Sequence, residues 1–98
     1  MISEREQLIL ELLQEARKSY GLDLVKRSNG RLPRGTVYVF LKRLEDKGFI
    51  VSEMEEASSG ESGPPRRVYA LTGLGATTLA AWNDYCAAQH ELNLSAGA

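Results

Sequence analysis

The chain has 98 residues, of which 43% are hydrophobic and 26% are charged, and its formal net charge is −1. This length predicts one domain with a thin core, because a small protein buries a smaller fraction of its surface than a large one. No apolar run approaches the ~20 residues that a membrane helix needs, no secretory signal opens the chain, and the single cysteine excludes a disulfide framework. We therefore expect a cytoplasmic protein that is not associated with a membrane.

The nearly neutral total hides an uneven distribution of charge along the chain. Seven cations lie between Lys26 and Lys47, against two anions, and no Lys or Arg follows Arg67. A polyanion responds to the local field of the surface that it meets, so a nearly neutral protein can still present a basic face.

The N-terminal part of the chain predicts two helices. Ser3 followed by Glu6 is a capping-box pattern, and the apolar residues behind it repeat at helical spacing. We expect a first helix over residues 4–18, broken by a Tyr-Gly pair, and a short second helix over residues 22–28, stopped by an Asn-Gly pair.

A third helix is predicted from residue 34 or 35 to residue 47. Pro33 before it favours an extended connector, and Gly48 behind it fits a left-handed helix cap. Two β-prone runs follow at residues 49–56 and 66–71, separated by a stretch rich in Gly, Ser and Pro. Such a stretch between two β-prone runs is typical of a hairpin with a long tip.

The last predicted element is an alanine-rich helix from residue 73 to about residue 92, for which Thr72 is the N-cap. Three helices followed by a hairpin is the order of a winged helix-turn-helix, in which the third helix reads DNA and the hairpin is the wing. We expect a mainly α fold with a small β-hairpin. Residues 1–72 are assigned to a DNA-binding domain, and residues 73–98 to a C-terminal dimerisation helix and tail.

The outward face of the third helix is the main candidate site. On a helical projection, Tyr38 and Val39 point away from the apolar stripe and stand beside cations. A glycine permits close approach of a backbone, a valine can contact a thymine methyl, and cations can meet phosphates or guanine. The candidate DNA-binding residues here are Arg34, Gly35, Thr36, Tyr38, Val39, Lys42 and Arg43. The alternative is that Tyr38 and Val39 are isolated surface apolar side chains, which are common.

Arg66 and Arg67 are a second candidate point of contact with DNA, at the entry to the last strand. There a wing would meet the flanking backbone or the minor groove. Alternatively, these arginines are solvated and pair weakly with the acidic residues of the hairpin. The acidic residues are Glu53, Glu55, Glu56 and Glu61.

Two linked motifs resemble the PadR family of winged-helix transcriptional regulators. They are GTVYVFLKRLEDKGFI at residues 35–50 and GPPRRVYALTGLG at residues 63–75. The residues at the positions of the second signature are Arg66, Arg67, Tyr69, Leu71, Thr72 and Gly75. The resemblance covers about residues 8–82, and two motifs at the right separation are more specific than either one alone.

The resemblance implies a dimeric transcriptional regulator, usually a repressor, with Gly35, Thr36 and Tyr38 near DNA. Val39 stands where proline is common in the family, so the local groove contacts are expected to differ. The short C-terminal part implies a single dimerisation helix and no large effector domain.

The C-terminal helix is apolar or alanine-rich around most of its circumference, which is more apolar surface than a thin core can cover. The expected partner is a second copy across a two-fold axis, with helix one of that copy taking part. Burial wholly within one chain is the alternative. The candidate interface residues are Leu8, Leu12, Leu79, Trp82, Tyr85 and Cys86. Two recognition helices related by a two-fold axis would require a pseudo-palindromic operator.

Two other functions stay open. Trp82 is either an aromatic anchor of the dimer or, as in some relatives, part of a pocket between subunits for a planar small molecule, which would make the protein a ligand-gated regulator. A winged helix can also bind another protein, here with the acidic wing as its docking face. We expect no catalytic site, cofactor or metal, because neither Cys86 nor His90 has partner groups at a suitable spacing.

Overall fold

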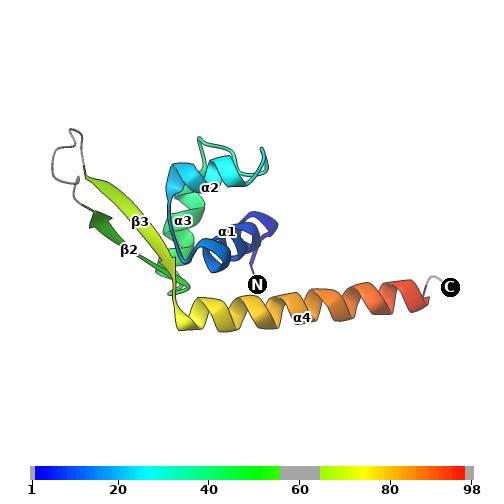
Figure 1. The fold of residues 1–98 in the computed structure, drawn as a ribbon. Helices are drawn as coiled ribbons and strands as arrows, with labels where there is room; N and C mark the ends of the chain where they lie inside the picture. The colour runs from blue at the N-terminus through cyan, green and yellow to red at the C-terminus, as the bar shows by residue number, and fades with distance from the viewer. Residues whose placement is uncertain (1, 56–64, 97–98) are drawn as a thin grey trace.

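The computed structural model describes residues 2–55 and 65–96 of the chain. Among these residues, three helices precede a hairpin and a long helix follows it (Figure 1). The elements are α1 (Glu4–Ala16), β1 (Lys18–Tyr20), α2 (Gly21–Arg27), α3 (Val37–Asp46), β2 (Ile50–Glu55), β3 (Arg66–Leu71) and α4 (Gly73–Ala96). This is the mainly α winged-helix fold that the sequence predicts.

Helix α1 begins where the sequence predicts and ends two residues early. The Ser3 Oγ accepts a hydrogen bond from Glu6 N at 3.2 Å, and the Glu6 Oε1 accepts one from Ser3 N at 3.0 Å, so the capping box is confirmed. The expected continuation of the helix to residue 18 is wrong. Arg17 has a φ of 68°, which ends the helix, and the next residues pair with β3 as strand β1.

The strands form one antiparallel sheet in the order β1-β3-β2. Strands β2 and β3 make the predicted hairpin, in which Ile50 pairs with Leu71, and the tip at residues 56–64 lies outside the described residues. Strand β1, which the sequence does not predict, lies on the other side of β3 and pairs Ser19 with Tyr69. The wing is therefore tied to the helical part of the molecule by a third strand.

Helices α2 and α3 form the helix-turn-helix. Helix α3 begins at Val37 and not at residue 34 or 35 as expected. The reason is that the Pro33 carbonyl accepts hydrogen bonds from Thr36 N at 3.2 Å and from Val37 N at 3.1 Å, which holds residues 34–36 in a turn. The recognition helix is thus preceded by a short, exposed turn.

Helix α4 starts close to the end of α3. Thr72 is its N-cap, as predicted: the Thr72 Oγ1 accepts a hydrogen bond from Gly75 N at 2.9 Å and donates one to Gly48 O at 2.8 Å. Gly48 has a φ of +82°, which confirms the predicted left-handed cap. A Cβ on Gly75 would lie 2.0 Å from Phe49 O, so α4 can approach this closely only because residue 75 is a glycine.

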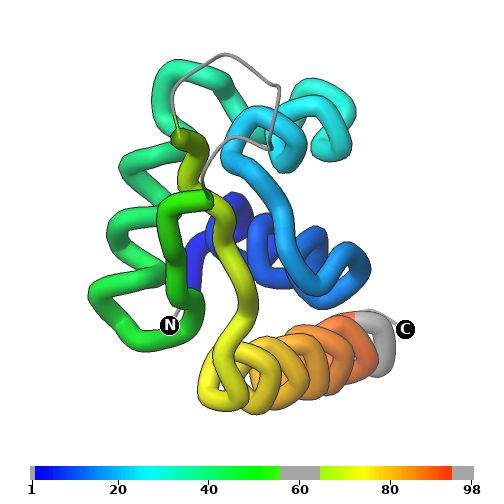
Figure 2. Tube along the Cα trace, turned by 60° about the vertical axis from the view of Figure 1, so that its left-hand side comes forward, coloured from blue at the N-terminus to red at the C-terminus, as the bar shows by residue number. Residues whose placement is uncertain are grey.

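The core lies between the helices, the sheet and the first turns of α4. Its fully buried apolar side chains are Ile9, Leu10, Leu13, Leu24, Leu32, Val37, Leu41, Leu44, Ile50 and Leu79. Figure 2 shows α4 along one side of the other elements, and Figure 1 shows its later turns running past them, which gives the molecule extents of 62 × 27 × 20 Å. One part of α4 therefore belongs to the core and the other extends beyond it.

Candidate nucleic-acid interface

Helix α3 buries one face and leaves the other open to solvent. Its buried side chains are Val37, Leu41 and Leu44, as the helical projection predicts. On the opposite side, Tyr38 and Val39 are each 50% exposed, and Lys42 and Arg43 are exposed beside them. The structure thus brings two large side chains and two cations together on one accessible surface.

The turn before α3 adds three exposed residues to this surface, Arg34, Gly35 and Thr36. Among the described residues, no atom would lie within 4 Å of a Cβ on Gly35, so that part of the chain leaves the space in front of it open. Thr36 is the N-cap residue of α3, and within the described part of the chain its side chain makes no capping hydrogen bond. Its hydroxyl is therefore not committed to the helix.

The two cations of α3 make weak contacts on their own helix. The Lys42 Nζ lies 2.9 Å from Asp46 Oδ1, and this hydrogen bond raises the pKa of the Lys42 ammonium. The Arg43 guanidinium lies 5.6 Å from the centre of the Phe40 ring. Exposed ion pairs and cation–π contacts contribute little to stability. A DNA phosphate can therefore take the place of Asp46 beside Lys42, or of Phe40 beside Arg43, at small cost in free energy.

The two wing arginines point to opposite faces of the sheet, since neighbouring residues in a strand alternate. Arg67 lies on the side of α3, where its Nη1 donates a hydrogen bond to Ser52 Oγ at 2.9 Å. The Ser52 hydroxyl in turn donates to Glu45 Oε2 of α3 at 2.5 Å. Arg67 also borders a hollow that it shares with Tyr38 and Lys42. The structure therefore joins this arginine to the surface of α3.

Arg66 lies on the other face of the wing, with its guanidinium 4.0 Å from the centre of the Tyr20 ring. The Tyr20 hydroxyl donates a hydrogen bond to Glu55, and this bond is the main reason that the pKa of Tyr20 is raised. The Lys18 Nζ pairs with Glu53 Oε1 at 3.8 Å. The acidic residues of β2 that the structure describes thus pair with β1, and neither arginine forms an ion pair with them.

These contacts add residues that sequence reasoning missed, namely Tyr20, Glu45 and Ser52. Glu45 and Ser52 are separated by a helix end, and Tyr20 was interpreted as part of a helix break. Tyr69 lines the hollow that Tyr38, Lys42 and Arg67 share. It is buried, and burial is the main cause that raises the pKa of its hydroxyl. A tyrosine in the middle of a predicted strand is the signal that could have placed it there.

Three of the six candidate interface residues pack inside the single chain. Leu8 and Leu12 are each 7% exposed and Leu79 is fully buried. These three side chains are therefore already largely covered by their own chain. Cys86 is half-buried, and Tyr85 is 52% exposed.

Helix α4 carries a separate, mostly apolar stripe on its exposed side. The stripe follows a spacing of four and three residues, which places its members on one side of a helix. Its members are Leu74, Thr78, Ala81, Tyr85, Ala88 and Leu92. Leu74 and Leu92 are 56% and 61% exposed. We refer to these six residues as the α4 stripe.

Trp82 lies at the border between the core and the α4 stripe. Its Nε1 donates a hydrogen bond to Gln7 Oε1 of α1 at 3.2 Å, and its ring stacks on Tyr85 with centroids 5.4 Å apart. Both rings line a mostly apolar hollow that also includes Ile2 and Phe49. The two aromatic side chains are thus held in place and remain partly accessible.

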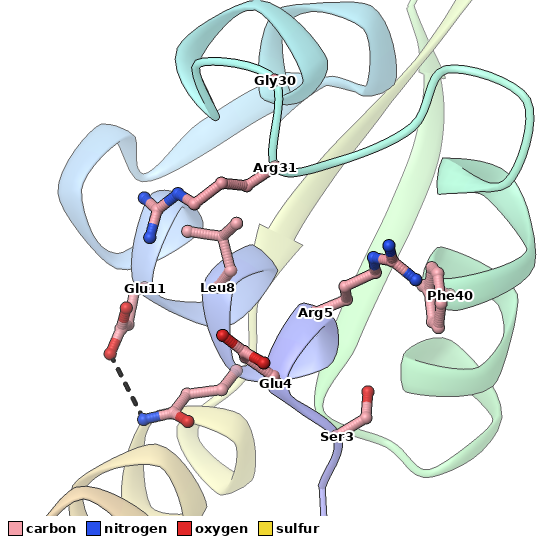
Figure 3. Close-up of a pocket in the computed structure, with 9 residues that line it drawn as sticks. Ser3, Glu4, Arg5, Leu8, Glu11, Gly30, Arg31 and Phe40 are labelled. Atoms are coloured by element: carbon pink, nitrogen blue, oxygen red, sulfur yellow. Dashed lines mark hydrogen bonds between the residues drawn. The ribbon is translucent and has the colours of Figure 1, made fainter.

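Another hollow lies between α1, the turn after α2, and Phe40 (Figure 3). It is lined by charges of both signs, which are Glu4, Arg5, Glu11 and Arg31. Opposite charges in one hollow cancel much of the local field, so this region does not extend the basic surface of α3.

Within residues 2–55 and 65–96, no group of His, Cys, Asp and Glu side chains could hold a metal ion. Among these residues there is also no helix with the length and apolar character that a membrane crossing requires.

An exposed recognition helix beside a β-hairpin defines the class of winged helix-turn-helix proteins. The sequence pattern of the transcriptional regulator PadR-like family matches residues 9–81. The chain belongs to this family, which confirms the resemblance of its two motifs.

Solved structures of PadR-type regulators share the fold. A PadR-like transcription factor from Bacteroides fragilis is 30% identical, with a TM-score of 0.71 over 95% of this chain and 86% of that one. A PadR family regulator from Clostridium difficile is 29% identical, with a TM-score of 0.76 over 92% and 94%. Bacillus subtilis PadR in complex with operator DNA is 25% identical, with a TM-score of 0.70 over 84% of this chain and 48% of that one. No curated protein sequence gives a significant match.

Proposed function

We propose that this protein binds duplex DNA sequence-specifically as a cytoplasmic homodimer and represses transcription from a pseudo-palindromic operator. The observation that carries the proposal is the open face of α3, where Tyr38 and Val39 stand exposed beside Lys42. The relative from Bacillus subtilis, whose structure includes operator DNA, supports it. Membership of a family of transcriptional regulators favours this role over that of an enzyme.

In this proposal α3 enters the major groove with its N-terminal end first. The open space at Gly35 lets the backbone approach the DNA, and Tyr38 and Val39 reach base edges or sugars. The cations of α3 meet phosphates or guanine, and Arg67 adds a contact from the wing. Arg66, on the far face of the wing, reaches only the flanking backbone.

Dimerisation follows from the α4 stripe. An exposed apolar stripe with a four-three spacing is the pattern by which two helices pack together. Residues 1–72 then act as the DNA-binding domain, and residues 73–98 hold two such domains at a fixed separation. Of the six interface residues expected from sequence, Tyr85, Trp82 and Cys86 remain available for this contact.

The test is a selection of binding sites from random duplex DNA by the purified protein, read at two salt concentrations. We expect two half-sites in inverted orientation, about one turn of DNA apart, and an affinity that falls steeply with salt. Lys42→Glu should weaken binding roughly 10- to 100-fold. Arg17→Glu, which makes the same charge change at the end of α1, is the matched control. A wild-type protein that selects no sequence contradicts the proposal and favours a protein-binding module with an acidic wing.

A second candidate function is sensing of a planar small molecule. The accessible Trp82 and Tyr85 rings beside an apolar hollow favour it. Binding of a planar aromatic compound would quench the fluorescence of Trp82 and release DNA at the same concentrations. If a panel of such compounds changes neither quantity, Trp82 serves only as an aromatic anchor.

A further inference from the structure

A glycine at the start of α2 touches the recognition helix. Gly21 is buried and is the first residue of α2. An ideal Cβ on Gly21 would lie 2.7 Å from Cε1, 2.9 Å from Cζ and 2.9 Å from Oη of Tyr38. Real Cβ atoms do not approach other atoms so closely, so the ring of Tyr38 rests directly on the backbone of Gly21.

The backbone conformation does not account for this glycine. Among the described residues, the glycines with a left-handed φ are Gly30 and Gly48. Gly21 instead lies within a helix, where alanine has the better intrinsic propensity. The feature that requires the absence of a side chain at position 21 is therefore the ring of Tyr38.

The same ring is half in solvent. Tyr38 is 50% exposed, and it borders the hollow that it shares with Lys42 and Arg67. One edge of the ring is thus fixed by α2, while the remainder belongs to the candidate DNA-binding surface. A ring that is already held loses less conformational freedom when it binds, so the contact with Gly21 prepares Tyr38 for recognition.

We propose that Gly21 is a positioning residue for DNA recognition, which seats the ring of Tyr38 so that its exposed part meets the DNA. The inference rests on the proposed function. A Cβ at position 21 would displace the ring and leave the fold intact, because the atoms that it meets are the far end of a flexible side chain. Gly75 is the contrasting case, since a Cβ there would meet the backbone oxygen of Phe49.

The test is Gly21→Ala, measured on a duplex that the wild-type protein has selected from a random pool. DNA affinity should fall roughly three- to tenfold, the range expected when an ordered side chain becomes free. The Tm should stay within about 4 °C of the wild type, because the change is compatible with a helix. Gly73→Ala is the matched control, because a Cβ on Gly73 would have no atom of the described residues within 4 Å, and it should change neither quantity.

A double-mutant cycle separates positioning from a general effect on the fold. Once Tyr38→Ala has removed the ring, Gly21→Ala should cost no further affinity. An equal loss with and without the ring overturns the inference, as does wild-type affinity in Gly21→Ala. A wild-type protein that selects no DNA overturns the proposed function itself, which is a different outcome.

The contact between Gly21 and the ring of Tyr38 can also be observed without DNA. In the wild-type protein, nuclear Overhauser effects should connect the Gly21 Hα protons with the ring protons of Tyr38. Their absence from a folded sample overturns the inference even if Gly21→Ala does not fold.

Discussion

Helices α3 and α4 both leave large apolar side chains in solvent, yet they differ in what surrounds those side chains. On α3, Tyr38 and Val39 are bordered by cations. On α4, Leu74 and Tyr85 are exposed to a similar extent, but small residues lie between them, and the helix has no Lys or Arg. A cationic border suits a polyanion, whereas a smooth apolar stripe suits a second apolar stripe. The exposed side chains of α3 and α4 therefore indicate two different partners, although their exposed fractions are similar.

The largest expected effect comes from detaching α4 from the core. This change would disrupt the exposed surface of α3 and the α4 stripe together. Leu79 is fully buried and anchors the first turns of α4 in the core. Leu79→Ala should lower the free energy of unfolding by about 2–5 kcal/mol, measured by urea denaturation. Thr77→Ala, on the exposed side of the same helix, should change it by less than about 0.5 kcal/mol. Similar values for the two variants would contradict the packing of Leu79.

Next comes a charge in the middle of the α4 stripe. Tyr85→Glu should raise the dimer dissociation constant roughly 100-fold, because a carboxylate would be buried against apolar surface. DNA affinity should fall with it, since two linked domains bind more tightly than one. Ala80→Glu adds the same charge at an exposed position of α4 that is not three or four residues from any member of the stripe, and it should leave the dimer intact. Sedimentation measurements that show equal association for both variants would exclude the α4 stripe as the interface.

A smaller effect is expected for one apolar contact on α3. Val39→Ala should weaken DNA binding roughly five- to tenfold and relax the preference for one base pair, as removal of a thymine-methyl contact does. The dimer should be unaffected. Val51→Ala is the matched control, since Val51 is 54% exposed on β2 and lies outside the surface of α3. Equal DNA affinities of the two variants would show that Val39 is an isolated apolar side chain on the surface and makes no contact with DNA.

The smallest effect concerns an ion pair that belongs to neither surface. Lys47 Nζ lies 2.7 Å from Oε2 of the buried Glu6. Burial alone would raise the pKa of Glu6, but hydrogen bonds from Lys47 and Ser3 and the charge of Lys47 outweigh it, and the pKa is lowered from 4.5. The stabilisation is therefore present above pH ~4.5 and is lost as the pH falls through the lowered value.

Lys47→Met should accordingly lower the free energy of unfolding by about 1 kcal/mol at pH 7, since Lys47 is partly solvated. The difference from the wild type should shrink below pH ~4 as Glu6 becomes protonated. The measurement is urea denaturation across this pH range. A difference that does not depend on pH would show that the ion pair is not its cause.

The periodic elements of this fold could be predicted from sequence, because their signals are local. The apolar spacing in α3 predicted which face is buried, and the Thr72 cap and Gly48 were predicted from single residue types. Strand β1 could not be predicted in this way. Its three residues form a strand only because β3, about fifty residues later, pairs with them.

The geometry of the candidate site could be predicted only in part, for a related reason. The exposed residues of α3 follow from helix geometry, whereas the opposite directions of Arg66 and Arg67 depend on the pairing of the sheet. The chain from Arg67 through Ser52 to Glu45 depends on tertiary packing. Sequence alone also could not tell an apolar face that packs in its own core, such as that of Leu79, from one that is left for a partner.

The most direct test of the central claim is the salt dependence of DNA affinity for the wild type and for Lys42→Gln. If the exposed face of α3 meets phosphates, the logarithm of affinity should fall linearly with the logarithm of salt concentration. The slope for Lys42→Gln should be smaller by about one for each subunit that loses a contact. A slope identical to that of the wild type, or a wild-type protein that binds no duplex at low salt, would contradict the account.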